Sequence, residues 1–301
     1  MTERNWRESV RRSLRRCPPL YAAARGVYRG FRKARRRLRR RSAGGGAQQP
    51  ERPPVVEISD AAVPVLAVVA RGWYGVTTST RSNFPNLMLW DGESPSIIAR
   101  SLLESDYSTI VFSGMPVAVA RAARIIKSRD PERVLLVHYH GSFTQCAQPI
   151  ILDRFQRVLG LARDGVVERI GCAKAGMAEA LRATGITATY LPYRIVAPQQ
   201  VERRPAGSPR RIGVFVRDIL RKNAHTQLVA ALMMENVEVH ANDAPDLSYL
   251  PGGHRIVEHG ELPNEEFTEL LGQMDLNLYV SLSECYPMVV VESMILSLIH
   301  I

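Results

Sequence analysis

Short apolar runs alternate with amphipathic stretches along the chain from residue 63 onward. Apolar runs rich in β-branched residues are typical of buried strands, and apolar positions spaced three or four apart are typical of helices. The pattern predicts strands at residues 63–70, 86–90, 109–113, 134–139, 170–173 and 189–192, and helices at 95–103, 117–127, 152–163 and 177–184. Regular alternation of this kind favours a mostly parallel sheet covered by helices.

A polar stretch with three prolines, residues 198–209, separates this set from a second one and makes a suitable domain boundary. The second set predicts strands at 212–216, 237–240, 254–258 and 276–280, and helices at 224–234 and 264–273. We therefore expect an α/β protein with two Rossmann-like, doubly wound domains that face a cleft, at residues 55–200 and 210–295. Ligands of such folds bind at the carboxyl ends of the strands.

The last six residues read LSLIHI, which matches the translation of a transposon-end adaptor used in sequencing libraries. We interpret residues 296–301 as a scar of that adaptor, and a genuine apolar helix end is the alternative. In either case we expect no closing strand after the final helix. The second domain is therefore expected to be incomplete.

Positive charge is concentrated at the amino-terminal end. The chain has a net charge of +11, but residues 1–42 hold 16 of the 40 basic and 2 of the 29 acidic residues. This arm thus carries +14 and the remainder −3. Aromatic and apolar positions recur at helical spacing on both sides of Pro18-Pro19, as in basic helices that lie on anionic membranes. Nucleic-acid backbone binding and a solvated tail are the alternatives, of which nucleic acid is the least favoured.

A glycine- and proline-rich linker at 43–54 follows the arm. The longest apolar run, 61–70, is too short to span a bilayer, and no secretory signal precedes it. Four widely spaced cysteines fit neither a zinc cluster nor a disulfide framework. We expect a cytoplasmic protein without metal or cofactor, attached through its arm to the inner face of the membrane.

Candidate chemistry lies at the predicted strand ends. Arg217 follows the strand at 212–216, and Lys222 comes five residues later, directly before a helix. Two cations beside free helix amides suit a phosphate or diphosphate. The alternative interpretation is a solvated loop.

A second candidate region follows the last predicted strand. Glu284 lies in a short loop, Pro287 fits the first turn of a helix, and Glu292 lies about two turns further on. The carboxylates suit sugar hydroxyls, and the Met288 and Val289 amides would face the ligand. Alternatively, Glu284 stabilises the helix dipole and Glu292 is a surface residue.

Glu284 and Glu292, with seven residues between them and preceded by NEEFTELLGQMDLNLYVSLS, resemble the E-x7-E region of retaining GT-B glycosyltransferases of the family-four type. Two earlier stretches, LLVHYHGS and GVFVRDILRK, also resemble this family, and they occur along the chain in the family's order. It implies that Arg217 and Lys222 bind the donor diphosphate. It also implies that His140, two residues after His138, lies next to the donor sugar. The stretch RGWYGV corresponds to the glycine-rich first loop of this family, and only its final Gly-Val matches. The resemblance therefore places Gly75 in that phosphate-binding loop.

The resemblance further implies that Glu284 holds hydroxyls of the donor sugar and Glu292 those of the ribose. It predicts transfer of a hexosyl group from a UDP- or GDP-linked sugar to a saccharide or lipid-linked acceptor, as in cell-surface polysaccharide synthesis. The alternative is a non-catalytic GT-B-like interaction protein that its basic arm docks to membrane or nucleic acid. A nucleotide-sugar epimerase of the same architecture is a further alternative.

Overall fold

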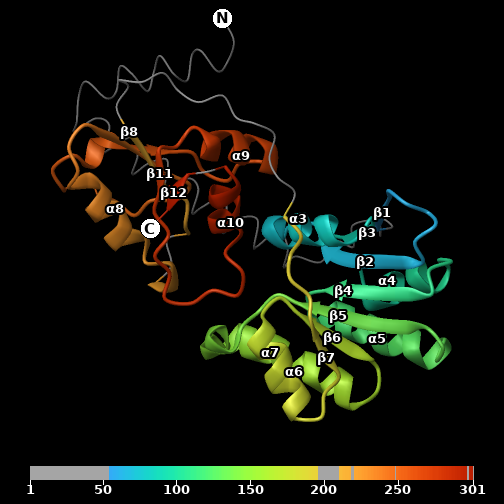
Figure 1. The fold of residues 1–301 in the computed structure, drawn as a ribbon. Helices are drawn as coiled ribbons and strands as arrows, with labels where there is room; N and C mark the ends of the chain where they lie inside the picture. The colour runs from blue at the N-terminus through green and yellow to red at the C-terminus, as the bar shows by residue number, and fades with distance from the viewer. Residues whose placement is uncertain (1–53, 196–209, 218–219, 248, 297, 301) are drawn as a thin grey trace, which may run out of the picture. The chain divides into compact units, whose positions relative to one another are not determined.

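A computed structural model describes residues 54–195, 210–217, 220–247, 249–296 and 298–300. The predicted arm at 1–42, nearly all of the predicted linker, and the predicted domain boundary at 198–209 lie outside these ranges. The described residues form two parallel-dominated sheets, each flanked by helices (Figure 1). Among them, no helix is long and apolar enough to cross a membrane.

The first sheet contains seven strands in the order β1-β3-β2-β4-β5-β6-β7. Only β1 runs antiparallel to its neighbour, and the direction of strand progression reverses between β2 and β4. The strands are β1 (Val55–Ile58), β2 (Val65–Ala70), β3 (Asn86–Trp90), β4 (Thr109–Ser113), β5 (Val134–Tyr139), β6 (Arg169–Cys172) and β7 (Ala188–Tyr190). The helices are α3 (Tyr74–Asn83), α4 (Pro95–Leu103), α5 (Val117–Arg129), α6 (Pro149–Arg163) and α7 (Ala175–Ala183).

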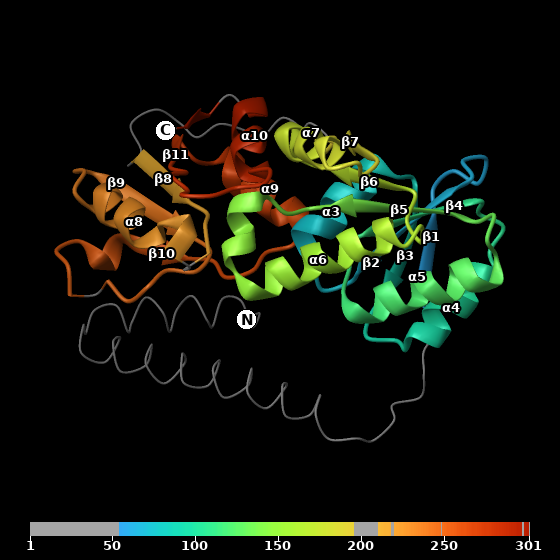
Figure 2. The ribbon, with the colours of Figure 1, turned by 90° about the horizontal axis from the view of Figure 1, so that it is seen from below.

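Helices cover both faces of this sheet. One continuous core joins alternate residues of the strands to buried residues of α4, α5, α6 and α7. The opposite face carries a smaller core, in which Ala67, Leu87 and Val111 pack against Phe84 at the end of α3. Figure 2 shows α4 and α5 together on one side of the strands. This distribution follows from right-handed crossovers, since the chain moves along the sheet one way through α3 and the other way through α5.

The second sheet contains five parallel strands in the order β10-β9-β8-β11-β12. The strands are β8 (Arg210–Val214), β9 (Val237–Ala241), β10 (Ile256–Glu258), β11 (Leu276–Asn277) and β12 (Ile299–His300), and the helices are α8 (Ala224–Leu232), α9 (Asn264–Gly272) and α10 (Met288–Ile295). Helix α8 packs on one face, and α9 and α10 contribute to the core of the other. The strand order corresponds to the 3-2-1-4-5 part of a Rossmann fold, and it reverses between β8 and β11.

Several predictions about elements were wrong. The strand predicted at 276–280 is only two residues long, and α3 and β1 were not predicted. Helix α3 escapes a periodicity search because its sequence, YGVTTSTRSN, is mostly polar and rich in residues of low helix propensity. The expected absence of a closing strand was also wrong, because Ile299 pairs with Leu276 in a parallel β11–β12 ladder.

Candidate functional site

The predicted cations and the first predicted carboxylate follow the two strands between which the order of the second sheet reverses. Arg217 and Lys222 come after β8, and Glu284 comes after β11. At such a reversal the crossovers leave in opposite directions, so the segments beyond the two strand ends border an open space. The topology thus brings these parts of the chain to one edge of one sheet.

One carboxylate oxygen of Glu284 lies at the centre of this cluster. It accepts hydrogen bonds from Lys222 Nζ, from Tyr279 OH at 2.9 Å and from Ser281 Oγ at 2.8 Å. Arg221 forms an ion pair with the same oxygen at 3.5 Å. The Lys222 and Glu284 side chains are 14% and 18% exposed, so solvent screens this pair far less than a surface pair. The structure therefore contains a mostly buried anion position that its own carboxylate fills.

Charge and burial shift the pKa of both partners. Burial alone would raise the pKa of Glu284, but the hydrogen bond and charge of Lys222, together with the hydrogen bonds of Ser281 and Tyr279, hold that pKa below its ordinary value. Burial lowers the pKa of Lys222, and the nearby positive charges of Arg221 and Arg217 lower it further. Glu284 is consequently ionised at neutral pH, as a partner for the cations must be.

Side chains fix the loops on which these groups lie. Gln227, which is 3% exposed, donates to Lys222 O at 2.8 Å and to Val280 O at 3.2 Å, and accepts from the Val280 amide at 2.7 Å. Arg221 donates to Ser283 O at 3.0 Å and accepts from the Leu282 amide at 2.8 Å. The Lys222 segment and the Glu284 segment are therefore tied to each other at several points.

Arg217 differs from Lys222 in being exposed at the end of its segment. The two residues that follow it lie outside the described part of the chain. Its charge nevertheless acts on Lys222, as the lowered pKa of Lys222 reflects. Arg217 thus lies close enough for its charge to act on Lys222, but within the described residues it makes no hydrogen bond or ion pair to Glu284.

Glu292 is 8% exposed on α10, and burial raises the pKa of its carboxyl group. Its interpretation as a surface residue was therefore wrong. Within the described ranges, no hydrogen bond or ion pair reaches its carboxylate. Helix α10 begins at Met288, with Pro287 as its N-cap, and the Met288 amide donates to Tyr286 O at 3.1 Å. Of the two amides expected to face a ligand, only that of Val289 lacks a backbone acceptor in the described turn.

The first sheet places His140 in a chain of neutral hydrogen bonds. Its Nε2 lies 2.7 Å from Ser113 Oγ, and its Nδ1 lies 2.7 Å from Tyr193 OH. Ser113 Oγ in turn lies 2.5 Å from Thr80 Oγ1. Burial and the neighbouring His138 hold the pKa of His140 well below its usual value. Both ring nitrogens are thus occupied by hydroxyl partners from the protein.

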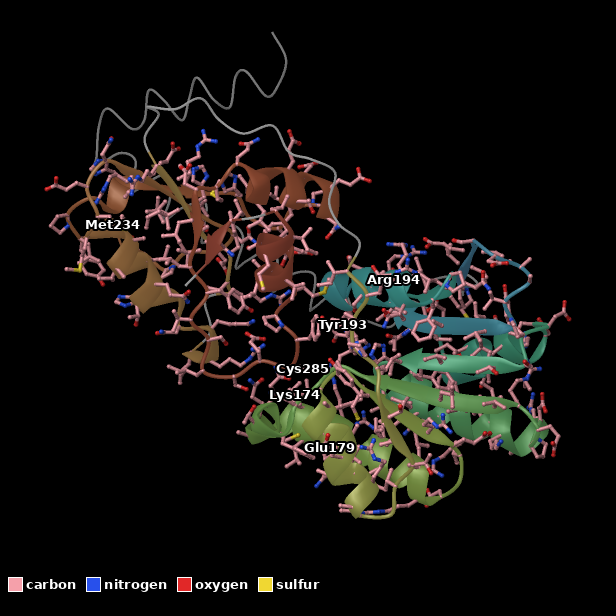
Figure 3. The ribbon with its side chains drawn as sticks, in the orientation of Figure 1. Lys174, Glu179, Tyr193, Arg194, Met234 and Cys285 are labelled. Carbon is pink, nitrogen blue, oxygen red and sulfur yellow. The ribbon has the colours of Figure 1, made fainter. Side chains whose placement is uncertain are left out.

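His138 is completely buried, and its Nε2–H donates to Leu191 O at 3.0 Å. Burial lowers the pKa of His138 to about 4. The Asn83 side chain donates a hydrogen bond to Pro192 O at 3.0 Å and accepts one from the Arg194 amide at 2.6 Å. The segment after β7 that contains Tyr193 and Arg194 (labelled in Figure 3) is therefore held by side chains of β5, of the loop directly after it and of α3.

Gly75 does not lie in a loop, as the resemblance implies, but in the first turn of α3. It is exposed, and a β-carbon added there would meet no atom within 4 Å. The true constraint in this region is Gly114, directly after β4, whose φ is +86° and whose added β-carbon would overlap the Trp73 ring. Trp73 and Gly114 therefore fix the start of α3 against the end of β4.

Hydrogen bonds also join loops of the two sheets within residues 52–301, which form one compact unit. Thr144 Oγ1 and Ser283 Oγ lie 2.6 Å apart, and Cys285 Sγ donates to Gly141 O at 3.1 Å. Lys174 Nζ donates to Glu284 O at 3.1 Å. Figure 3 labels Lys174 and Cys285 in this region. The residues that flank His140 and Glu284 are thus in direct contact.

Sequence reasoning missed most of the groups that surround the predicted ones. Tyr279 and Ser281 were assigned to a strand or its end, and Tyr193 was not considered. Arg221 was the easiest to find, because it is a second cation directly beside Lys222. Among the described residues, no cluster of three or more His, Cys, Asp or Glu side chains has the arrangement of a metal site.

No model of a known protein family matches this chain, and no curated protein matches it in sequence. Solved structures define the fold, which is the α/β fold of GT-B glycosyltransferases. The chain is similar to HepE of Anabaena in complex with UDP and glucose, with a TM-score of 0.54, 14% identity, and coverage of 79% of this chain and 80% of that one.

It is also similar to the pneumococcal O-GlcNAc transferase GtfA in complex with UDP and GlcNAc, with a TM-score of 0.52 and 13% identity. That match covers 68% of this chain and 43% of GtfA, so the chain spans less than half of GtfA. The apo lipopolysaccharide outer core galactosyltransferase WaaB has a TM-score of 0.50 and 13% identity, over 78% of this chain and 79% of that one.

Proposed function

We propose that this protein is a glycosyltransferase that uses a nucleotide-sugar donor. The observation that carries the proposal is the cluster of Arg217, Arg221 and Lys222 beside Glu284, at the strand reversal of a Rossmann-like sheet. The structures of HepE and GtfA are complexes with UDP, which supports a nucleotide-linked donor in this fold.

The cations have a clear chemical role in such a reaction. When the bond from the anomeric carbon to the diphosphate breaks, negative charge accumulates on the leaving phosphate oxygens. Positive groups already held in place stabilise that charge without reorganising, an effect that is often worth several kcal/mol. We assign this role to Lys222, Arg221 and Arg217, and we assign no general base.

The other roles follow the resemblance and are part of the proposal. Glu292 is a buried carboxylate that suits the hydroxyls of the donor ribose. Glu284 would hold hydroxyls of the transferred hexosyl group. His140 serves as a positioning residue, because Ser113 and Tyr193 occupy both of its ring nitrogens. Transfer would proceed with retention, from a UDP- or GDP-linked sugar.

We further propose a saccharide or lipid-linked acceptor in polysaccharide synthesis, and no resident cofactor. The +14 arm at residues 1–42 would attach the enzyme peripherally to the anionic inner face of the membrane. Liposome sedimentation of the full chain, compared with a chain beginning at Pro53, tests this attachment. Binding that ignores lipid charge, or equal binding of the two chains, would remove the membrane role.

The alternative is a non-catalytic interaction protein with a GT-B-like fold. The observation that favours it is the pairing of Lys222 with Glu284, since a purely structural ion pair would look the same. A panel of UDP- and GDP-sugars with mixed saccharide and lipid-linked acceptors distinguishes the two. Release of nucleoside diphosphate that depends on Lys222 supports the transferase. No release from any donor, by a protein that remains folded, supports the interaction protein.

A further inference from the structure

The arrangement around Glu284 is that of a bound anion. A single carboxylate oxygen accepts from an ammonium group and two hydroxyls, with a guanidinium at 3.5 Å. Phosphate oxygens select the same set of donors, because they are strong acceptors that carry negative charge. The position that suits a ligand phosphate is thus filled by a side chain of the protein.

Among the described residues, the charges in the cluster do not balance. Arg221 and Lys222 both pair with one carboxylate, Glu284, and the positive charge of Arg217 acts on Lys222. A carboxylate carries one negative charge, whereas the diphosphate of a nucleotide sugar carries one on each of its two phosphates. A diphosphate would therefore neutralise these cations better than Glu284 does, and a neutral ligand would not replace it.

We propose that Glu284 is an internal stand-in for the donor diphosphate, and that the diphosphate displaces it from Lys222 on binding. This inference rests on the proposed function and extends it. The exchange breaks no covalent bond, because one anion replaces another at the same cations. Once released, the Glu284 carboxylate is available to the hydroxyls of the sugar, so donor binding itself prepares the sugar contact.

The backbone around Glu284 makes such an exchange possible without movement of the loop. Arg221 holds Ser283 O and the Leu282 amide, and Lys174 holds Glu284 O. These bonds use backbone atoms and do not depend on the Glu284 carboxylate. Rotation of one side chain is therefore sufficient to vacate the anion position.

Calorimetric titration with inorganic pyrophosphate tests the exchange without a sugar or a base. In Glu284→Gln the side chain keeps its size but loses the charge that competes for Lys222, and we expect pyrophosphate to bind about ten-fold more tightly than to the wild-type protein. Glu284→Asp keeps the charge but shortens the side chain by one methylene, and should tighten binding less. Equal or weaker binding to folded Glu284→Gln overturns the proposal.

Two controls complete the experiment. Glu292→Gln removes a carboxylate assigned to the ribose, so it should leave pyrophosphate affinity unchanged. If Glu284→Gln does not fold, the Glu284→Asp titration decides, and unchanged affinity in that variant overturns the exchange. Absence of pyrophosphate binding to every variant overturns it as well.

Turnover of nucleotide sugars by the wild-type protein separates this inference from the proposed function. Tighter pyrophosphate binding to Glu284→Gln with no turnover of any donor keeps the exchange and rejects the transferase. Turnover with no gain in pyrophosphate affinity keeps the transferase and rejects the exchange.

Discussion

Polar groups at the carboxyl edges of the two sheets are organised in different ways. In the second sheet, Lys222, Arg221 and Glu284 form a charged cluster in which one carboxylate serves several donors. In the first sheet, His140 and Tyr193 belong to a chain of neutral groups in which both ring nitrogens of His140 have a hydroxyl partner. The first arrangement offers partners that a charged ligand can replace, whereas the second leaves no nitrogen of His140 for a ligand.

This difference has a physical origin. In a mostly buried ion pair the opposite charges attract each other strongly. An anion with more negative charge can therefore replace the carboxylate as the partner of the cations. A buried neutral hydrogen bond depends on geometry, and an unsatisfied group costs about 1–3 kcal/mol when its partner leaves. We therefore expect the second-sheet cluster to govern ligand binding and turnover, and the first-sheet cluster to govern stability.

The largest expected effect tests the charged cluster. Arg217→Ala or Lys222→Ala should lower turnover by at least about 100-fold, and by up to about 1,000-fold, because an oriented charge stabiliser is lost. Initial rates of nucleoside diphosphate release measure this. The matched control is Arg163→Ala, which removes an exposed cation at the end of α6. If Arg217→Ala and Lys222→Ala both keep rates within a few-fold of the wild-type rate, the diphosphate binds elsewhere.

The next prediction tests the neutral cluster through pH. His138 has an ordinary pKa of 6.5, but burial lowers it to about 4 in the fold. Between these two pH values the unfolded chain binds more protons than the folded protein. The contribution of neutral His138 to the free energy of unfolding is therefore fully present above about pH 7 and falls as the pH drops toward 4. The loss reaches about 3 kcal/mol. Denaturant unfolding from pH 7.5 to 4.5 measures it.

The variant His138→Phe should reduce this pH dependence by roughly one bound proton, whatever its effect on stability at neutral pH. An unaltered slope in His138→Phe would show that His138 does not carry the titration.

A smaller effect distinguishes the two carboxylates. Glu292→Gln should weaken binding of the free nucleoside diphosphate about ten-fold, because hydroxyls of the ribose lose a charged acceptor. The opposite sign is expected for pyrophosphate in Glu284→Gln. Calorimetry with UDP and GDP is the measurement. If the affinity for both nucleotides is unchanged, Glu292 does not contact the ribose.

The smallest effect concerns Tyr193. Tyr193→Phe removes the hydroxyl that bonds His140 Nδ1 and should lower the unfolding free energy by about 1 kcal/mol. Tyr190→Phe, at a side chain that is 48% exposed, is the control and should have almost no effect. Urea unfolding at pH 7.5 compares the two. A loss in Tyr190→Phe equal to that in Tyr193→Phe would contradict the assignment.

Much of the fold was predictable because buried parallel strands leave a plain signal. The strands at 86–90, 109–113 and 134–139 match the structure to the residue, since both faces of each are covered and the apolar run is continuous. Helix α3 gave no such signal, because its Ser and Thr side chains bond within the helix and to Ser113 instead of forming an apolar stripe.

The candidate site was predictable only in part. Arg217 stands out because it directly follows a predicted strand, Lys222 because it precedes a helix five residues later, and Glu284 because it lies in the loop after the last predicted strand. Tyr279 was hidden in the stretch predicted as strand 276–280, which the structure ends after Asn277. Tyr193 lies 53 residues from His140 along the chain, and only the closing of the sheet brings them together. Pairings of that kind depend on topology and have no local pattern.

The shortness of β11 has a consequence for how the protein opens. Three residues beyond Asn277, both backbone groups of Val280 are bonded to the amide side chain of Gln227 instead of to a neighbouring strand. A residue whose two backbone groups depend on one side chain can lose both bonds without unzipping the strands next to it. The Val280 amide should therefore exchange its hydrogen with solvent by a local opening, well before the amides of β8.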